Sequence, residues 1–423
     1  MSINSTQKIN TKLGNNRLFY VCRDIERTQG GLFLDIPNYC IITNDSPLSL
    51  ELKKTHGEQI HIINKGETLD TWELLKKTDL ITPDDYVVVF KNTPQIERTC
   101  LTKKWTLLNP SADLSNKIEE KISQIEWLGE LKKYLPGYEA KECKNINWEE
   151  EKFILQFNRS HTGSGTVLIK NKDQLEKIRE KFPNRPARIA RYIKGPLFTN
   201  NNIVGKDKTL IGNISYQITG LRPFTDKQFA TIGNDWFFPH KYLNEDQIKK
   251  YNKIVLDIGK KLQESGWKGL YGVDIVEDEE TKDLFLLEIN ARQPASTTFE
   301  SELQENVILS ETKDLKNTSK ILRSTQNDRL NTFEAHLMSL LDLDIVEELT
   351  KIENGSQIIF RNQIKKIKIK NTVNKLKEKD FSVIFYNNDK PNSDLLRIQS
   401  KNSVIKNHNL LNANGEDIKN IIN

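Results

Sequence analysis

Short apolar runs alternate with longer polar stretches over residues 17–90. Four of the runs have strand-like composition, and they start at Leu18, Tyr39, Ile60 and Tyr86. The polar stretches 47–56 and 70–78 have the composition of helices. Strands that alternate with helices predict a small α/β unit with a parallel sheet. The pattern G-x-G-x-x-G does not follow the first strand, so a dinucleotide cofactor is not indicated.

Helical and strand patterns also organise the middle of the chain. Residues 116–135 predict one helix, because apolar residues recur on one face and Pro136-Gly137 ends the pattern. Two strands, 153–157 and 166–169, follow on either side of a polar loop. Residues 245–264 predict a second long helix, capped by Asn244. The apolar face of the first helix consists of Ile118, Ile122, Ile125, Leu128 and Leu131.

The tail of the chain has a mixed pattern. Residues 333–350 predict a helix, and four strand-like runs (QIIF, IKIK, SVIFY and DLLRI) follow Gly355. These runs predict a small β-rich terminal subdomain. One face of the second run carries Lys366, Lys368 and Lys370, which suits an ordinary solvated strand face or, alternatively, a surface for an anionic partner.

The hairpin formed by residues 270–276 and 284–290 carries the sharpest chemical signal. Side chains on a strand alternate between the two faces of a sheet. The face expected to join the core consists of Tyr271, Val273, Ile275, Phe285, Leu287 and Ile289. The other face carries Asp274, Glu288 and Asn290, with Arg292 just beyond.

Two carboxylates that face each other make this hairpin a candidate metal site. A turn centred near Thr281 sets Asp274 directly opposite Glu288, where the two repel by up to about 1 kcal/mol, and more when desolvated. A divalent cation turns that repulsion into binding. Two carboxylates and the amide oxygen of Asn290 form a shell of the kind that Mg²⁺ prefers. The alternative is a half-exposed sheet whose outer face is simply polar.

Two further segments have compositions that suit nucleotide binding. Residues 160–166 (SHTGSGT) lie between two strands, and their small side chains let backbone N–H groups approach phosphate oxygens. A flexible hairpin tip explains the same composition. Residues 188–196 (RIARYIKGP) predict a strand that runs into a Gly-Pro turn, with backbone groups able to pair with an adenine edge.

Taken in order, these segments resemble the ATP-grasp superfamily over residues 116–300. The most specific part is GVDIV followed fourteen positions on by LLEINAR, which resembles the superfamily's E-x-N-x-R signature. The resemblance implies that Asp274, Glu288 and Asn290 bind one or two Mg²⁺ ions, with Mn²⁺ as a substitute, bridging the ATP phosphates. It also implies that Arg292 steadies the transferred phosphate and the acyl oxyanion.

The same resemblance implies three groups of nucleotide-binding residues. Lys121 resembles a lysine of the entry helix that contacts phosphate. A mobile flap over the β- and γ-phosphates would consist of Thr162, Gly163, Ser164, Gly165 and Thr166. The hinge that bonds adenine through its backbone would consist of Arg191, Tyr192 and Ile193.

The sequence departs from the superfamily pattern near the nucleotide. Gln156 stands where a second phosphate-binding lysine is expected, on the strand before the flap. Ala190 and Arg191 replace acidic hinge residues, and Leu197 stands where a ribose-binding glutamate is expected. Arg222 is a candidate replacement cation or carboxylate anchor, and the alternative is an ordinary surface arginine.

Composition narrows the class of protein further. A chain of 423 residues with 36% hydrophobic and 29% charged residues suits a soluble globular protein. No apolar run approaches the roughly 18 residues of a membrane span, and the polar start lacks a secretory signal, so a cytoplasmic protein is expected. Four scattered cysteines and six histidines without an H-E-x-x-H pattern do not favour a zinc site. With 63 basic against 58 acidic residues, a nucleic-acid or membrane partner is not expected.

Together, the patterns and the resemblance to the ATP-grasp superfamily imply a mixed α/β and α+β fold of three domains. They are an N-terminal pre-ATP-grasp α/β domain (1–115), a two-lobed ATP-grasp domain (116–310) and a small, β-rich C-terminal α+β subdomain (311–423). The resemblance implies an ATP-dependent ligase that joins a small carboxylate, such as an amino acid or peptide, to an amine through an acyl phosphate, with a homodimer left open. The alternative is a nucleotide-binding or sensor protein with a drifted, non-catalytic site. A nucleic-acid binder that uses the C-terminal lysines is a third hypothesis.

Overall fold

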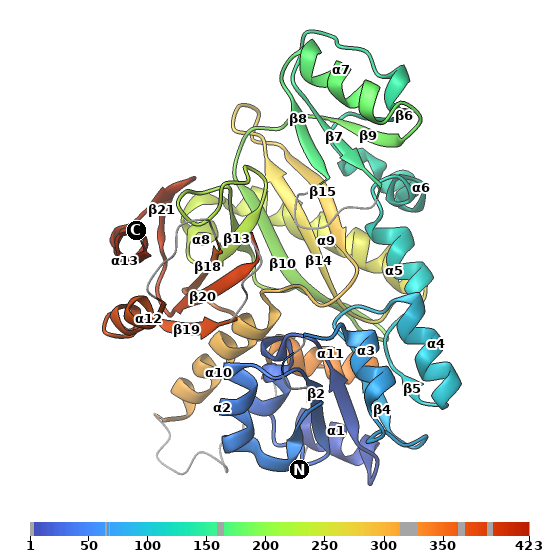
Figure 1. Ribbon diagram of the computed structural model, residues 1–423, viewed down its shortest axis with the longest axis vertical. Helices are drawn as coiled ribbons and strands as arrows, with labels where there is room; N and C mark the ends of the chain where they lie inside the picture. The colour runs from blue at the N-terminus through green and yellow to red at the C-terminus, as the bar shows by residue number, and fades with distance from the viewer. Residues whose placement is uncertain are drawn as a thin grey trace.

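The computed structural model describes residues 4–63, 66, 68–158, 165–313, 329–362, 369–386 and 392–422, with the side chains of 311–313 left out. Its N-terminal unit is a parallel sheet of five strands in the order β3-β2-β1-β4-β5 (Figure 1). The strands are β1 (Leu18–Val21), β2 (Tyr39–Thr43), β3 (Ile60–Ile62), β4 (Tyr86–Val88) and β5 (Thr106–Leu107). The helices are α1 (Ser5–Leu13), α2 (Pro47–His56), α3 (Thr71–Lys77) and α4 (Pro94–Lys103), with 3-10 helices η1 (Ile25–Phe33) and η2 (Gly57–Gln59). Phe19 packs in one cluster with residues of α3 and α4, and Tyr20 packs in another with residues of α1. The predicted α/β unit with a parallel sheet is confirmed.

The single helix predicted over residues 116–135 is wrong. The segment forms α5 (Ala112–Glu119), α6 (Ser123–Leu128) and the 3-10 helix η3 (Gly129–Tyr134). The break falls at Glu120, whose backbone is extended, with φ −70° and ψ 133°. The N–H of Lys121 donates to the backbone oxygen of Asn158 (3.2 Å), and the N–H of Ile122 donates to its side-chain oxygen (2.9 Å). These two bonds replace helical bonds and tie the break to the end of a distant strand.

A small antiparallel sheet with the order β6-β9-β7-β8 follows, and we call it, together with α7, the small lobe. Its elements are β6 (Tyr138–Glu142), the 3-10 helix η4 (Cys143–Asn145), β7 (Phe153–Phe157), β8 (Thr166–Ile169), α7 (Lys172–Lys181) and β9 (Pro186–Arg191). The two predicted strands of 153–157 and 166–169 are confirmed. Leu155 and Ala187 pack with Leu175 of α7 in one cluster. Because side chains alternate along a strand, Gln156 and Arg188 lie on the opposite face of the small sheet, away from α7.

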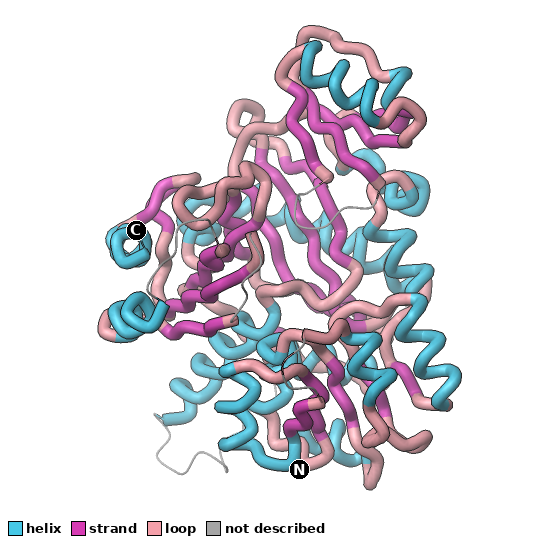
Figure 2. Tube along the Cα trace, in the orientation of Figure 1, coloured by secondary structure: helices cyan, strands magenta, loops and turns pink. Residues whose placement is uncertain are grey.

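Nine strands of the described chain form a large antiparallel sheet, ordered β15-β14-β10-β12-β13-β18-β20-β19 with β11 added to β10. They are β10 (Leu197–Val204), β11 (Thr209–Leu210), β12 (Ser215–Thr219), β13 (Thr231–Asp235), β14 (Gly269–Glu277), β15 (Leu284–Asn290), β18 (Ser356–Arg361), β19 (Ser382–Phe385) and β20 (Asp394–Ser400). The small lobe stands at one end of this sheet and the N-terminal unit at the other (Figure 1). Figure 2 shows the strands running through the middle of the molecule, with helices along its outer edges.

The face of the large sheet that carries Val273 and Ile289 is covered by helix α9 (Glu245–Glu264). The predicted limits of α9 and its Asn244 cap are confirmed, since the Asn244 side chain accepts a hydrogen bond from the N–H of Gln247 at 2.9 Å. The buried stripe of α9 includes Tyr251, Val255, Ile258 and Leu262. This packing leaves the opposite face of β14 and β15 for polar side chains.

The tail joins the large sheet, and two details of its prediction are wrong. The helix predicted over 333–350 is α11 (Thr332–Leu340) only, because Asp342 has a positive φ of 57° and Lys268 binds the carbonyl oxygen of Leu340 at 2.9 Å. Ile369 and Lys370, predicted as strand, begin helix α12 (Ile369–Lys377), where the spacing of Ile369, Val373 and Leu376 suits a helical face against the core. Lys366 and Lys368 lie outside the described residues.

The predicted strands QIIF, SVIFY and DLLRI are present as β18, β19 and β20. They extend the same sheet as β13, so the sheet crosses the predicted boundary at residue 311, and the division into domains stays a prediction. The remaining elements are α8 (Phe238–Tyr242), α10 (Thr297–Lys313), α13 (Ala413–Ile422), β16 (Arg329–Leu330), β17 (Glu348–Leu349), β21 (Ile405–Asn407) and β22 (Leu410–Leu411). Among the described helices, none combines the length and apolar character that crossing a bilayer requires.

Candidate active site

The β14–β15 hairpin pairs Asp274 directly with Glu288, as predicted. The ladder shifts at one point, because Ile275 pairs with Leu286 and leaves Leu287 as an extra residue in β15. This bulge also corrects the predicted core face. Leu286 is fully buried, whereas Phe285 and Leu287, predicted to point inward, are only half-buried. The extra residue keeps the two carboxylates opposite each other.

Asp274 is the member of the carboxylate pair with a raised pKa. Its Oδ1 atom is buried and makes no hydrogen bond of good geometry among the described residues, its Oδ2 accepts from Asn290 Nδ2 at 3.4 Å, and the Thr199 hydroxyl nearby favours the ionised form. Burial, followed by the negative charge of Glu288, raises the pKa of Asp274 to about 6. An enclosed carboxylate oxygen without a donor is the arrangement that a cation relieves.

Lys121 is the direct ionic partner of Glu288. Its ammonium nitrogen lies 2.9 Å from Glu288 Oε1, and only 3% of the lysine side chain is exposed. The break between α5 and α6 brings this lysine to the sheet. The residue predicted to contact phosphate therefore lies beside the carboxylates, where an incoming phosphate would compete with Glu288 for it.

Arg292 is held by two contacts on different elements. Its Nη1 pairs with the buried Glu119 of α5, and its Nη2 donates to Asn290 Oδ1 at 2.9 Å. Glu119 also pairs with Lys91, which follows β4 of the N-terminal unit. Burial alone would raise the pKa of Glu119, but the charges of Arg292 and Lys91 outweigh it and hold that pKa below its ordinary value. Sequence reasoning missed Glu119 and Lys91, because no local pattern marks a contact between residues 173 positions apart.

The residues fit a divalent cation through two carboxylates and one amide. In the described part of the chain no group of three or more His, Cys, Asp or Glu side chains could hold a metal, so Asp274 and Glu288 need oxygens of another kind. Asn290 can supply one, although its oxygen here accepts from Arg292 and the amide's orientation follows that bond. Phosphate oxygens and water are the usual additional ligands of Mg²⁺. The assignment of Asn290 as a ligand stays a prediction.

The predicted hinge connects β9 of the small lobe with β10 of the large sheet. Arg191 is half-exposed, 3.5 Å from Asp278, and stacks over the ring of Phe285. No backbone hydrogen bond of Tyr192 or Ile193 occurs within the described ranges, so their N–H and C=O groups suit an external partner. Gly195 is required for close packing, since a Cβ there would lie 1.8 Å from the carbonyl oxygen of Glu277.

The predicted flap is described in part. Thr162, Gly163 and Ser164 lie outside the described residues. Gly165 accepts a hydrogen bond from the N–H of Phe157 at 3.1 Å, and Thr166 receives one from Gln156 Nε2 at 3.3 Å. Gln156 thus points along the face of the small sheet that is free of α7.

Arg222 lies in the loop between β12 and β13, and 81% of its side chain is exposed. Its charged partner among the described side chains is Asp226, at 3.9 Å. This environment favours the alternative of a surface arginine, and a role in binding or catalysis stays a prediction.

The N-terminal parallel sheet, the small lobe and the large sheet with its carboxylate hairpin together define the ATP-grasp fold. A carboxyaminoimidazole ribonucleotide synthase from Aspergillus clavatus, solved with ATP, has a TM-score of 0.63 at 16% identity, covering 96% of this chain and 98% of that one. An N5-carboxyaminoimidazole synthetase from Staphylococcus aureus, solved with ADP, has a TM-score of 0.61 at 10% identity, covering 96% and 97%. An L-amino acid ligase from Bacillus licheniformis has a TM-score of 0.62 at 12% identity, covering 92% and 94%. No family model and no curated protein matches the sequence, so the likeness is one of fold.

Proposed function

We propose that this protein is an ATP-dependent ligase that activates a small carboxylate as an acyl phosphate and joins it to an amine. The observation that carries the proposal is the opposed pair Asp274 and Glu288, flanked by Lys121 and Arg292. A buried carboxylate oxygen without a donor is costly in a purely structural hairpin. In a phosphoryl-transfer site, Asp274 Oδ1 would bind a divalent cation.

Mg²⁺ held by Asp274, Glu288 and Asn290 would neutralise the phosphate oxygens and favour attack at the γ-phosphorus. The chain's own cations complete the neutralisation. Lys121 lies close enough to Glu288 to exchange a carboxylate for a phosphate oxygen as its partner. Arg292 keeps its position through Glu119 and presents its guanidinium beside Asn290.

The reaction needs alignment and charge neutralisation more than covalent help from the protein. A carboxylate oxygen of the substrate attacks the γ-phosphorus, the bond to the β-phosphate oxygen breaks, and ADP leaves. The amine then attacks the acyl carbon, phosphate leaves with the former carboxylate oxygen, and the nitrogen loses a proton. The hinge backbone at Tyr192 and Ile193 would hold the adenine, and the flap would exclude water from the acyl phosphate.

The names of two solved structures of the same fold support the substrate class that we propose. One neighbour is named as an amino acid ligase, and another is named as a synthase of a carboxylated aminoimidazole ribonucleotide. We favour an amino acid, peptide or similar small acid as the carboxylate, and an amine as the acceptor. A homodimer and a cytoplasmic location stay predictions.

The test is release of ADP and phosphate from MgATP in the presence of a panel of amino acids and other small acids, each with and without a second amino acid as acceptor. The expected result is release that depends on both partners and stops when the divalent cation is chelated, with Mn²⁺ restoring it. Product mass should equal the sum of acid and amine less one water.

Calorimetry with ADP separates the ligase from the non-catalytic alternative. Nucleotide binding with no turnover against the whole panel would favour a nucleotide-binding protein of the same fold. An absence of nucleotide binding by folded protein would reject both.

A further inference from the structure

Arg188, on β9 of the small lobe, is a fully buried cation that the ligase site described above does not use. It is 1% exposed and is the largest charged side chain among those most completely buried. The residues on either side of it in β9 follow the pattern expected of a sheet: Ala187 packs toward α7, and Arg188 points to the other face.

Arg188 has little to neutralise it inside the protein. Among the described residues, its side chain makes one hydrogen bond, from Nη1 to Gln124 Oε1 at 3.5 Å, and its buried Nε has no acceptor. None of the described Asp or Glu side chains lies within ion-pair distance of Arg188. A buried cation without a counter-ion is unfavourable unless something else supplies the negative charge.

The surroundings of Arg188 indicate which group could supply the negative charge that neutralises it. Arg188 pairs across the strands with Gln156, which in turn pairs with Thr166 at the end of the flap. The negative charge of Glu288 favours the protonated forms of both Arg188 and Arg292, and Lys121 forms an ion pair with Glu288. Three cations from three separate segments therefore lie within electrostatic reach of Glu288, and one of them, Arg188, has no ion-pair partner among the described residues.

Burial lowers the pKa of Arg188 to about 10, with the charge of Glu288 acting in the opposite direction, so the guanidinium still carries its proton at neutral pH. The planar guanidinium has donors spaced to bind two phosphate oxygens at once.

We propose that Arg188 is the phosphate-binding cation of the small lobe, supplying from β9 the charge that Gln156, its neighbour on β7, cannot supply. The proposal rests on the ATP-dependent function proposed above. It explains why a neutral residue is tolerated at position 156. The proposed ligand is the phosphate part of the nucleotide, since Arg188 lies across β7 from Thr166 at the flap end of β8.

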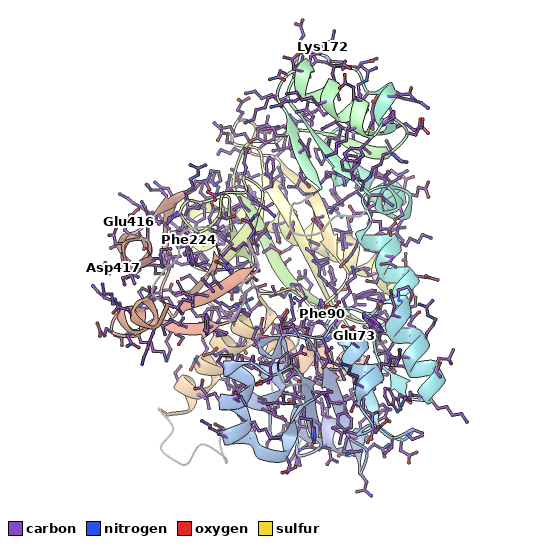
Figure 3. The ribbon with its side chains drawn as sticks, viewed as in Figure 1. Glu73, Phe90, Lys172, Phe224, Glu416 and Asp417 are labelled. Carbon is purple, nitrogen blue, oxygen red and sulfur yellow. The ribbon has the colours of Figure 1, made fainter. Side chains whose placement is uncertain are left out.

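The experiment compares Arg188→Gln with Arg188→Lys and with a matched loss of charge at Lys172. Lys172 is exposed at the outer end of the small lobe (Figure 3). The affinities for ADP and for adenosine are measured by calorimetry, with Mg²⁺ present. Arg188→Gln should weaken ADP binding about tenfold or more, as for loss of one charged hydrogen-bond pair, and leave adenosine binding within about twofold. Arg188→Lys should retain most of the ADP affinity, and Lys172→Gln should match the wild type.

A second variant tests whether positions 156 and 188 serve the same phosphate. Gln156→Lys, introduced into Arg188→Gln, should restore most of the lost ADP affinity. The melting temperature without ligand should not fall in Arg188→Gln, because the variant removes an uncompensated charge. The rise in melting temperature on adding ADP should shrink instead.

The outcomes separate this proposal from the proposed function. Unchanged ADP affinity in Arg188→Gln, or equal losses for ADP and adenosine, would overturn the assignment of Arg188 while leaving the ligase intact. A lower melting temperature without ligand, with no rescue by Gln156→Lys, would make Arg188 a structural residue. A wild-type protein that binds no ADP would overturn both proposals together.

Discussion

Asp274 and Glu300 are two carboxylates with raised pKa values, yet their surroundings differ. The pKa of Glu300, on α10, is raised to about 7 by burial. Its Oε1 accepts from the backbone and side chain of Asn213 and from Thr332, all at 3.3 Å, and its Oε2 accepts from Asn201. Asp274 has a pKa of about 6, one buried oxygen without a donor, and a second carboxylate opposite it.

A raised pKa therefore does not by itself mark a binding site. Glu300 is surrounded by neutral donors that satisfy both of its oxygens, as expected of a carboxyl group that joins parts of a fold. Asp274 is left incomplete by the protein and faces a like charge. The feature that distinguishes the candidate site is therefore the unsatisfied oxygen together with the opposed carboxylate.

The largest expected effect is on activity at the incomplete carboxylate. Asp274→Asn removes the charge that a divalent cation would bind, so ligase kcat/KM should fall about a hundred- to a thousandfold, the range for loss of one group that stabilises charge in a transition state. Glu300→Gln should keep kcat/KM within about threefold, since its contacts are structural. ADP release under saturating acid and amine measures both.

Folding is checked separately, because both variants alter enclosed polar groups. Circular dichroism and thermal melting of the two proteins, with and without Mg²⁺, provide the control. Equal losses of activity in the two variants would remove the distinction between them, and so would a Mg²⁺-dependent stabilisation that survives in Asp274→Asn.

A smaller effect is expected on stability, at the satisfied carboxylate. The folded-state pKa of Glu300, about 7, lies above its ordinary value of 4.5, so between these pH values the folded protein binds more protons than the unfolded chain. The stability contributed by Glu300 is therefore fully present below about pH 4.5 and is lost as the pH rises through 7. The difference amounts to about 3 kcal/mol in the free energy of unfolding, at 1.36 kcal/mol per pH unit.

Glu300→Gln removes this titration. Urea unfolding of the wild type and of Glu300→Gln at pH 5, 6, 7 and 8 measures the difference between the two curves, which cancels the other titrating groups. The difference should shift in favour of the glutamine variant as the pH rises. Two parallel curves would show that Glu300 has the same pKa in the folded and unfolded states.

Strong local patterns made the parts of the fold that position the site predictable from the sequence. The helix 245–264 was predictable to its limits because a clear apolar stripe coincides with a capping Asn244. The pairing of Asp274 with Glu288 was predictable from strand alternation and turn position. The bulge at Leu287 was not, because nothing in the local composition marks an extra residue in a ladder.

Features that depend on long-range contacts were not predictable. The break after Glu119 depends on Asn158, whose oxygens receive the N–H groups of Lys121 and Ile122. The cation Arg188 stood in the sequence beside the predicted hinge, but only the pairing of β7 with β9 sets it across from Gln156. Burial without a counter-ion, the property that distinguishes Arg188, exists only in the folded chain.

A smaller effect again is expected at Glu119, which positions Arg292 and does not touch the carboxylate pair itself. Glu119→Gln removes the charge shared by Arg292 and Lys91, so Arg292 should lose its fixed orientation. We expect kcat to fall roughly tenfold, in keeping with the cost of misplacing a catalytic group, with little change in the KM for ATP. Glu119→Asp should recover part of the kcat. A loss confined to the KM for ATP, or to thermal stability, would contradict a positioning role.

The smallest effect is expected at Arg222, a cation that lies away from Glu288, Lys121 and Arg292. Lys121 is buried against Glu288, whereas Arg222 is exposed and 3.9 Å from an exposed Asp226. Surface ion pairs of this kind contribute about 0–1 kcal/mol. Arg222→Gln should therefore leave kcat and the KM for each substrate within about twofold, and Lys121→Gln should lower kcat/KM at least about tenfold as a lost charged contact. A KM for the acid that rises in Arg222→Gln, with the KM for ATP unchanged, would instead make Arg222 the carboxylate anchor, and would mean that the loop between β12 and β13 closes on the substrate during the reaction.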